Sequence, residues 1–537
     1  MDDGGTDGAR DGGEHGEKWS LHENFLRDSG GVYTLAAEFE RGSTRMGIWS
    51  KVIGVVLAIA LAFGGPRATN GSVADEKKTA AVDEVFADLT KAGSPGCALG
   101  VYRDGKMLYS KGYGLANLEE RVPISPNSVF DIGSTSKQFS AASILLLEKR
   151  GKLSVSDDVR QYIPELPDYG QKITILQLLN HTSGLRDYLT LMELAGINTD
   201  SVTTDEDALR IIVRQKALNF APGSDWLYSN TGFFLLSVIV KRVSGKTLRE
   251  FAAENIFAPL QMTHTQYRDD HTSLIANRAL AYDPKDKEGG YSLNVSYFEQ
   301  TGDGAVHTSV EDLLKWDENF YSGQIGGKEF LSEIQEQGKL NSGKVLDYAK
   351  GLRIAEYRGL RTVSHGGSWG GYRAELLRFP EQHFSVACLC NLGSASPSNR
   401  AHRVADVYLA GLMKPKEEKK KELKEDERQK AEIRLAEEQL RDYLGDYSSD
   451  ELRVSYRLET AEGKLKLTIG LPSGAFTSLG NSPQDYLRAT GTDEFQFGKT
   501  GIAIHFQRNA EHRVTGFTLD AGRTRGLAFV RTLTGKS

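Results

Sequence analysis

The sequence has 537 residues, of which 39% are hydrophobic and 26% charged, and its formal net charge is −6 at pH 7. At roughly 100–200 residues per domain, this length predicts two or three domains, and the apolar fraction is sufficient for a sizeable core. The mild net charge, without a basic patch, argues against a nucleic-acid-binding protein.

A secretory signal peptide is predicted for residues 46–74. Lys51 supplies a positive flank, an apolar run follows at 52–65, and the small residues 72–74 offer a cleavage site. The run is shorter than the ~20 residues that a membrane-spanning helix needs, which favours cleavage. We therefore expect an exported protein, periplasmic or extracellular, with an uncleaved membrane anchor as the alternative.

Residues 1–45 do not fit this pattern, because a signal peptide normally begins at the N-terminus. They are rich in Gly and Asp and show no hydrophobic periodicity. We expect translation to start at Met46 and the preceding segment to be a non-native or disordered extension.

Residues 75–413 have the pattern of a single α+β domain. A strand is predicted at 97–103, a returning strand at 106–112 and a buried helix at 135–150. After a long, mainly helical middle, four strand patterns and a helix follow, at 348–356, 361–364, 374–379, 384–390 and 403–413. Strands at both ends with helices between them predict one sheet that pairs the first hairpin with the late strands.

Three cysteines, Cys97, Cys388 and Cys390, lie in apolar, strand-like runs. Cys388 and Cys390 share one strand face, and their spacing is not that of a zinc-binding C-x-x-C motif. A sparse, odd number gives no disulfide framework, so we expect three small buried side chains and no metal site.

The last part of the chain changes character twice. Residues 414–439 form a charged run that predicts a solvated helical linker. From 440 to 537 short alternating strands separated by turns predict a small all-β domain, barrel or sandwich. These strands are expected at 452–459, 464–469, 494–497, 502–506, 514–519 and 526–530.

Ser134-Thr135-Ser136-Lys137 is an S-x-x-K motif at the start of the predicted buried helix. Residues three apart lie on one helical face. An alcohol becomes a good nucleophile only when a base takes its proton, and a lysine amine away from water can accept or relay that proton. Because this spacing also arises by chance, the motif alone is weak evidence.

Tyr228-Ser229-Asn230 is a Y-x-N motif. A phenol held beside an ammonium loses its proton more easily, so Tyr228 can serve as a base and later as an acid. Asn230 can hold Lys137 and donate to a substrate amide. The alternative is a buried tyrosine that precedes the cap of an apolar helix.

His365-Gly366-Gly367 is an H-x-G motif at the end of a predicted strand. Gly367 would let substrate lie against the strand edge, and the N–H groups of Ser368 and Ser134 could together bind an oxyanion. His365 could bind a substrate carboxylate or assist proton transfer. The alternative is a surface histidine in a glycine-rich turn.

A competing motif overlaps this segment, because residues 366–370 also fit G-x-S-x-G, the nucleophile elbow of α/β-hydrolases. In that case Ser368 would be the nucleophile. The elbow requires a long helix after the turn, whereas residues 372–380 have the pattern of a strand.

In their order along the chain, the three motifs resemble those of the beta-lactamase-related serine hydrolases. That family contains class C β-lactamases, D-Ala-D-Ala carboxypeptidases, D-aminopeptidases and certain esterases. The resemblance covers about 95–413 and includes PGCALGVYRDGK, FDIGSTSKQFSA, LLNHTSGLRDY, YSNTGFFLL, GDGAVHTSVEDLLKW and SHGGSWGGYRAELLRFP. The tail from about 440 is more loosely similar to lipocalin-like β domains appended to some of these enzymes.

The resemblance implies a beta-lactamase/transpeptidase-like fold and roles for the matching residues. Ser134 would attack a carbonyl and form an acyl-enzyme, Lys137 and Tyr228 would share the general base and acid work, and Asn230 would position Lys137 and substrate. His365 stands where class C β-lactamases carry the lysine of K-T-G. This departure argues against efficient antibiotic hydrolysis.

We therefore expect an exported serine hydrolase that cleaves an amide or ester of a small molecule or peptide. The alternatives are a β-lactamase proper, a penicillin- or peptidoglycan-binding receptor that is acylated without turnover, and ligand binding by the C-terminal domain. His181, in HTSGL, resembles a structural residue beside the site. We expect no cofactor, and contact with membrane only through the export signal or an anchor.

Overall fold

The computed structural model describes residues 73–197, 201–285, 289–416, 433, 435–470, 476–478, 486–498 and 501–532. The chain divides into two units, Met1–Asn70 and Gly71–Ser537, and the described residues belong to the second. The predicted extension at 1–45, almost all of the signal peptide at 46–74 and most of the charged run at 414–439 lie outside the described residues. Among the described helices, none is long and apolar enough to cross a membrane.

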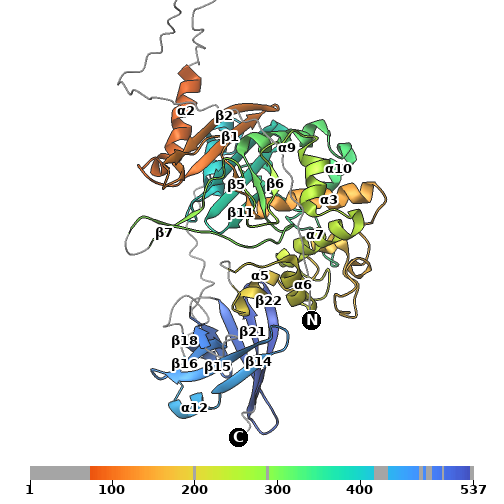
Figure 1. The fold of residues 1–537 in the computed structure, drawn as a ribbon, viewed down its shortest axis with the longest axis vertical. Coiled ribbons are helices and arrows are strands. Elements are labelled where there is room, and N and C mark those ends of the chain that lie inside the picture. Colours follow the sequence, from red (N-terminus) through yellow and green to blue (C-terminus); the bar gives the residue numbers. More distant parts are fainter. Residues whose placement is uncertain are drawn as a thin grey trace, which may run out of the picture. The chain divides into compact units, whose positions relative to one another are not determined.

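A six-stranded antiparallel sheet forms the centre of the first domain (Figure 1). Its order is β10 (Arg353–Tyr357), β11 (Leu360–Trp369), β12 (Tyr372–Phe379), β13 (Phe384–Cys390), β1 (Cys97–Arg103) and β2 (Lys106–Tyr113). The first hairpin thus pairs with the late strands, and the predicted α+β class is confirmed. The short strands outside it are β3 (Leu115–Asn117), β4 (Val122–Pro123), β5 (Phe130–Asp131), β6 (Gln266–Tyr267), β7 (Tyr282–Pro284), β8 (Tyr291–Leu293) and β9 (Val306–Thr308).

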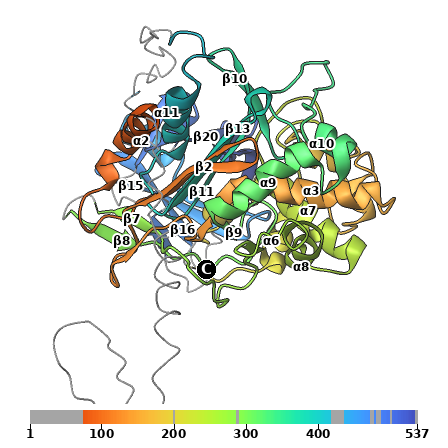
Figure 2. The same ribbon diagram turned by 90° about the horizontal axis from the view of Figure 1, so that it is seen from above.

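Both faces of the sheet are covered by helices (Figure 2). Along β1, Leu99 and Val101 face a core with α2 (Val73–Val85) and α11 (Pro397–Leu409), whereas Ala98 and Tyr102 face a core with α9 (Val310–Ser322). This alternation follows from the two-residue period of a strand. The second core also holds α3 (Lys137–Lys149), α4 (Ile175–Leu179), α5 (Tyr188–Leu194), α6 (Asp205–Val213), α7 (Asn230–Ser244), α8 (Leu248–Ala252) and α10 (Gly327–Ile334).

Two boundaries differ from the prediction in a way that shapes the site. The strand expected from Tyr348 begins only at Arg353, and β11 continues past His365 to Trp369. Tyr348 is therefore in a loop before β10, and His365 lies inside a strand.

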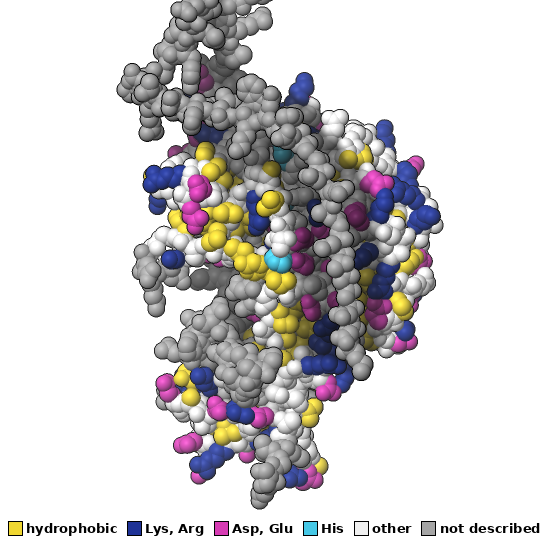
Figure 3. All heavy atoms as spheres, in the orientation of Figure 1, with side chains coloured by type: hydrophobic (Ala, Val, Ile, Leu, Met, Phe, Trp, Pro, Cys, Tyr) yellow, Lys and Arg dark blue, Asp and Glu magenta, His cyan; other side chains and the backbone are white. Residues whose placement is uncertain are grey.

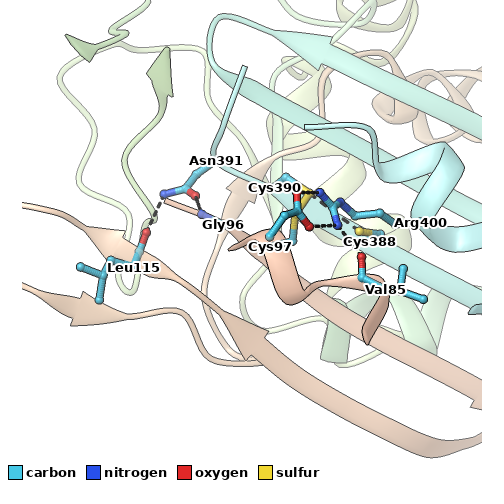
Figure 4. Close-up of a disulfide and its surroundings, with 9 residues drawn as sticks. Val85, Gly96, Cys97, Leu115, Cys388, Cys390, Asn391 and Arg400 are labelled. Atoms are coloured by element: carbon cyan, nitrogen blue, oxygen red, sulfur yellow. Dashed lines mark hydrogen bonds and ion pairs between the residues drawn. A yellow bond between two sulfur atoms is a disulfide. The ribbon is translucent and has the colours of Figure 1, made fainter. Parts of the chain in front are cut away.

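The cysteine prediction is wrong for two of the three residues. Cys97 and Cys390 form a disulfide, because they are directly opposite each other on β1 and β13 (Figure 4). The pair is separated by 293 residues, so sequence spacing gave no sign of it. Cys388 is a free, buried thiol as expected, and burial raises its pKa to about 12.

The second domain is a closed antiparallel barrel. Its nine-stranded sheet is closed by pairing of β15 (Val454–Ala461) with β16 (Lys464–Gly470), which confirms the predicted small β-barrel. The remaining elements are α12 (Glu437–Arg441), β14 (Gly445–Ser449), β17 (Phe476–Ser478), β18 (Tyr486–Gly491), β19 (Glu494–Phe497), β20 (Ile502–Arg508), β21 (Val514–Ala521) and β22 (Thr524–Arg531). Contacting aromatic rings fill its core: Tyr443, Tyr447, Tyr456, Phe495, Phe506, Phe517 and Phe529.

Candidate active site

Ser134 lies on a tight turn between β5 and α3. The turn is a short helix, η2 (Gly133–Ser136), and Asp131 fixes its start by accepting a hydrogen bond of 2.7 Å from the N–H of Gly133. Gly133 has a positive φ of 49°, and a Cβ there would lie 2.6 Å from the backbone nitrogen of Ser368. Glycine is thus required where β11 approaches the turn that carries Ser134.

Lys137 begins α3 and is completely buried beneath Ser134. Its Nζ lies 3.1 Å from Ser134 Oγ, 2.9 Å from Asn230 Oδ1 and 2.5 Å from the carbonyl oxygen of Asp303. These three contacts match the three donors of an ammonium. A neutral amine would keep two of them and accept the hydroxyl proton of Ser134 instead.

Asn230 connects this lysine to a second helix. It is the first residue of α7, and its backbone N–H donates a hydrogen bond of 2.6 Å to Asp187 Oδ2. Its side-chain oxygen accepts from Lys137, so its amide N–H groups are the donors that this side chain can offer. Asp187 caps α5 and is 1% exposed.

The ring of Tyr228 lies beside Lys137. The Lys137 Nζ is 5.0 Å from the ring centroid. The hydroxyl is buried and has no hydrogen-bond partner among the described residues. Such an orphaned polar group is costly, and its presence in a cavity with Ser134 marks a candidate functional group.

His365 is held on both ring nitrogens within β11. Nε2 lies 2.9 Å from the hydroxyl of Tyr348, and Nδ1 lies 2.6 Å from the carbonyl oxygen of Gly366. A carbonyl can only accept, so Nδ1 carries the proton and Nε2 accepts from Tyr348. Burial, and then the nearby Lys137, lower the pKa of His365 to about 3. The ring is therefore neutral near pH 7 and offers no positive charge to a substrate carboxylate.

Gly367 allows β11 to pack against η2. A Cβ at Gly367 would lie 1.8 Å from the carbonyl oxygen of Ile132, and Thr135 Oγ1 donates a hydrogen bond of 3.0 Å to the carbonyl oxygen of His365. The close approach is made by the protein's own backbone. It also places the backbone of Ser368 next to Gly133 and hence near Ser134.

The alternative elbow motif is wrong. Ser368 lies in β11, and β12 follows directly after a turn at Gly370 and Gly371, with no helix. A nucleophile elbow needs a strand, a sharp turn and a helix.

His181 packs against Tyr228, with its ring centroid 4.2 Å from that of Tyr228 in a tilted arrangement. It is 1% exposed, and its Nδ1 accepts a hydrogen bond of 3.2 Å from the N–H of Ser229, whereas its Nε2 has no hydrogen-bond partner among the described residues. Burial holds its pKa well below the usual range. These contacts agree with a structural role.

A cavity of about 660 Å³ brings the predicted residues together, except the buried Lys137 below its floor. It is lined by Ser134, Tyr228, Asn230, His365, Gly367 and Ser368. Its apolar walls are Leu189, Phe298 and Trp369. Asp303 and the barrel residue Arg523 also line the cavity, and neither residue was singled out in the sequence.

Asp303 is the missed residue closest to the lysine. Its carbonyl oxygen accepts from Lys137, while its carboxyl accepts a hydrogen bond of 3.1 Å from the hydroxyl of Tyr188. Burial raises the pKa of Asp303 to about 7. The signal was present in GDGAVHT, which contributed to the family resemblance without any residue in it being assigned a role.

The fold is that of the beta-lactamase/transpeptidase-like class. The Beta-lactamase family model matches residues 82–409, and the chain belongs to this family. Penicillin-binding protein 4* of Bacillus subtilis (strain 168) is 31% identical over 303 residues, which cover 53% of this chain and 66% of that protein. A D-aminopeptidase of Cereibacter sphaeroides is 29% identical over 320 residues, covering 59% of this chain and 60% of its own. The chain thus spans less than two thirds of these relatives' length.

Solved structures show the same fold. The octameric penicillin-binding protein homologue from Pyrococcus abyssi is 23% identical with a TM-score of 0.56, and the match covers 84% of this chain and 99% of that one. The D-amino acid amidase from Ochrobactrum anthropi SV3 is 21% identical with a TM-score of 0.54, and the match covers 62% of this chain and 99% of the amidase chain.

Proposed function

We propose that this protein is an exported hydrolase that cleaves an amide or ester through an acyl-enzyme on Ser134, as a D-amino-acid peptidase, carboxypeptidase or esterase. The observation that carries the proposal is the 3.1 Å contact between the buried Lys137 Nζ and Ser134 Oγ. A hydroxyl with an amine in hydrogen-bond reach can be deprotonated as it attacks.

Acylation begins with the neutral amine of Lys137. It takes the proton of Ser134 while Oγ forms a bond to the substrate carbonyl carbon, and the carbonyl electron pair moves onto oxygen. The N–H groups of Ser134 and Ser368 bind this oxyanion. Asn230 holds Lys137 in place through Oδ1.

The tetrahedral adduct then collapses and the bond to the leaving group breaks. The hydroxyl of Tyr228, which lacks a partner among the described residues, donates its proton to the leaving atom and is reprotonated by the Lys137 ammonium. Water next attacks the acyl carbon and gives one proton to the same two groups. The bond from that carbon to Ser134 Oγ then breaks, Oγ receives the proton, and the acid is released. The positive charge that the pair gains in each half-reaction is balanced by the oxyanion of the tetrahedral adduct.

A hydrolase of peptide-like substrates is favoured over a β-lactamase proper. His365 takes the place of a lysine and is neutral, because burial lowers its pKa to about 3. Relatives named D-aminopeptidase and a structural neighbour named D-amino acid amidase support amides of D-amino acids as candidates. The experiment below distinguishes hydrolysis from the alternative, a receptor that is acylated without turnover.

Export is supported by two independent features. Residues 46–74 have the pattern of a secretory signal, and disulfides such as Cys97–Cys390 persist mainly in oxidising compartments. On the face in Figure 3, basic and acidic side chains of the described residues are interspersed, so this face has no broad basic patch of the kind that binds nucleic acid.

The test is a substrate panel followed by mass spectrometry of the intact protein. Short-chain p-nitrophenyl esters, nitrocefin and a D-Ala-D-Ala peptide are each incubated with wild type and with Ser134→Ala. We expect catalytic turnover of an ester or the peptide that is lost in Ser134→Ala. A stable adduct without turnover on every compound would identify a receptor, and turnover of nitrocefin alone a β-lactamase.

A further inference from the structure

The barrel is joined to the hydrolase domain by a buried ion pair. Arg186 Nη1 lies 2.6 Å from Glu451 Oε2, and their side chains are 1% and 6% exposed. The same guanidinium donates to the carbonyl oxygens of Arg525 and Gly526 at the start of β22. The hairpin of β21 and β22 is therefore fixed at its tip.

Asn219 of the hydrolase domain completes this attachment. Its Nδ2 donates a hydrogen bond of 3.0 Å to the carbonyl oxygen of Arg523, and its Oδ1 accepts one of 2.8 Å from the N–H of Arg525. The turn residue Gly522 has a positive φ of 51°. Two hydrogen bonds from the Asn219 side chain to the main chain, one on either side of Thr524, thus set the position of Arg523.

The guanidinium of Arg523 lines the candidate active site. Its central carbon is 4.6 Å from the ring centroid of Tyr228, and its Nη1 is 3.8 Å from Asp187 Oδ2. That carboxylate oxygen already accepts from the N–H of Asn230 at 2.6 Å, and 3.8 Å is too long for a hydrogen bond. The side chain is 44% exposed, so its donors are accessible from the cavity.

The other cations that line the cavity are differently engaged. Arg268 donates to the carbonyl oxygens of His271 and Ser296, and Arg373 donates to those of Gly370 and Tyr372. Three arginines line the cavity among the described residues. Arg523 differs from the other two because its guanidinium donates to no backbone carbonyl there.

Burial reduces the negative charge that three carboxyl groups in the cavity wall carry near pH 7. Burial raises the pKa of Asp131 to about 6, and those of Asp303 and Glu375 to about 7. Part of their population is uncharged near pH 7.

We propose that Arg523, supplied by the barrel, binds a carboxylate on the leaving-group side of the substrate. The side is set by Tyr228, because the phenol that protonates the leaving atom lies directly under the guanidinium. Arg binds a carboxylate through two parallel N–H donors. The proposal rests on the function proposed above and narrows the substrates to amides and esters whose leaving group carries a free carboxylate, as at a peptide C-terminus.

The test uses two aryl esters that differ in one group on the leaving phenol, a carboxylate or a primary carboxamide. Arg523→Ala is expected to lower kcat/KM for the carboxylate ester by about 10- to 100-fold, mainly through KM, and to leave the carboxamide ester nearly unchanged. Arg523→Lys should restore part of the loss. Arg525→Ala, which removes a half-exposed guanidinium from the same hairpin, should affect neither ester.

Equal losses on both esters would overturn the proposal, since Arg523 would then act on Tyr228 or on the attachment of the hairpin. A second measurement does not require turnover. In the Ser134→Ala protein, calorimetry should show tighter binding of the carboxylate ester, and adding Arg523→Ala should abolish that preference. If the preference for the carboxylate ester survives Arg523→Ala, the proposed role of Arg523 is contradicted. If the preference is lost but the wild-type protein shows no turnover, only the proposed hydrolysis is contradicted.

Discussion

The Tyr348 hydroxyl lies 2.9 Å from Nε2 of His365 and donates to it, so the contact holds a neutral ring, whose pKa burial lowers to about 3. The residue type that replaces a lysine in the H-x-G motif therefore does not replace its charge. We propose that the positive charge for an anionic substrate comes instead from Arg523, which belongs to the barrel domain.

The neutral state of His365 predicts a dependence of stability on pH. Its pKa is about 3 in the folded protein and about 6.5 when unfolded, so the unfolded state binds more protons. The contribution of His365 to the free energy of unfolding is therefore complete above about pH 6.5 and is lost as the pH falls toward 3. From pH 7 to pH 5 this residue should lower the free energy of unfolding by about 2 kcal/mol.

Urea unfolding at both pH values checks this. His365→Asn should show a smaller decrease than wild type, whereas His512→Asn, at an exposed position, should match wild type. Identical pH dependence in His365→Asn and wild type would show that folding does not lower the pKa of His365.

Gly367→Ala tests whether glycine is required at this position because β11 packs closely against the turn that carries Ser134. Its Cβ would lie 1.8 Å from the carbonyl oxygen of Ile132, so β11 must move away from the turn that carries Ser134. We expect acylation to slow by about a hundredfold or more. Gly366→Ala is the matched control, because its nearest contact is the Glu375 side chain at 3.0 Å. Equal acylation rates in the two variants would contradict this reading of Gly367.

The sequence predicted the sheet and the motif residues for physical reasons. A short apolar run that ends at a turn identifies the strand at 97–103, and a helix that is apolar nearly all round, such as α3, must be buried. Ser134 and Lys137 are brought together by helical spacing alone. The contact of Lys137 with Asn230 required the family resemblance, since 93 residues separate them.

The features that were missed depend on tertiary contact without a local pattern. The Cys97–Cys390 pair follows from strand register, and Tyr348 reaches His365 because β10 starts later than its apolar pattern suggested. Arg523 is an ordinary turn residue in the sequence. Only the attachment of the barrel hairpin places it beside Tyr228.

Glu451→Gln should destabilise the protein strongly. It leaves the Arg186 guanidinium buried without its charge partner, which costs about 3–5 kcal/mol in comparable pairs. Asp450→Asn removes the neighbouring carboxylate, which is 84% exposed in its pair with Lys216, and should change the free energy of unfolding by less than about 1 kcal/mol. Urea unfolding of both variants measures the difference, and similar small effects would show that the Arg186–Glu451 pair does not hold the barrel.

Lys137→Ala should slow acylation by about 10²- to 10⁴-fold, because the Ser134 proton loses its acceptor. Lys149→Ala, at the exposed end of the same helix, is the control and should acylate at the wild-type rate. Single-turnover kinetics with an activated ester give both rates. A near-normal rate in Lys137→Ala, with the fold intact by circular dichroism, would remove this lysine from proton transfer.

The most direct test is to trap the acyl-enzyme and locate it. Wild-type protein is quenched with acid during turnover of an activated ester, digested, and its peptides are sequenced by mass spectrometry. We expect one acyl group, on Ser134, and none in Ser134→Ala. An acyl group on Ser368, or one that persists after Ser134→Ala, would contradict this expectation.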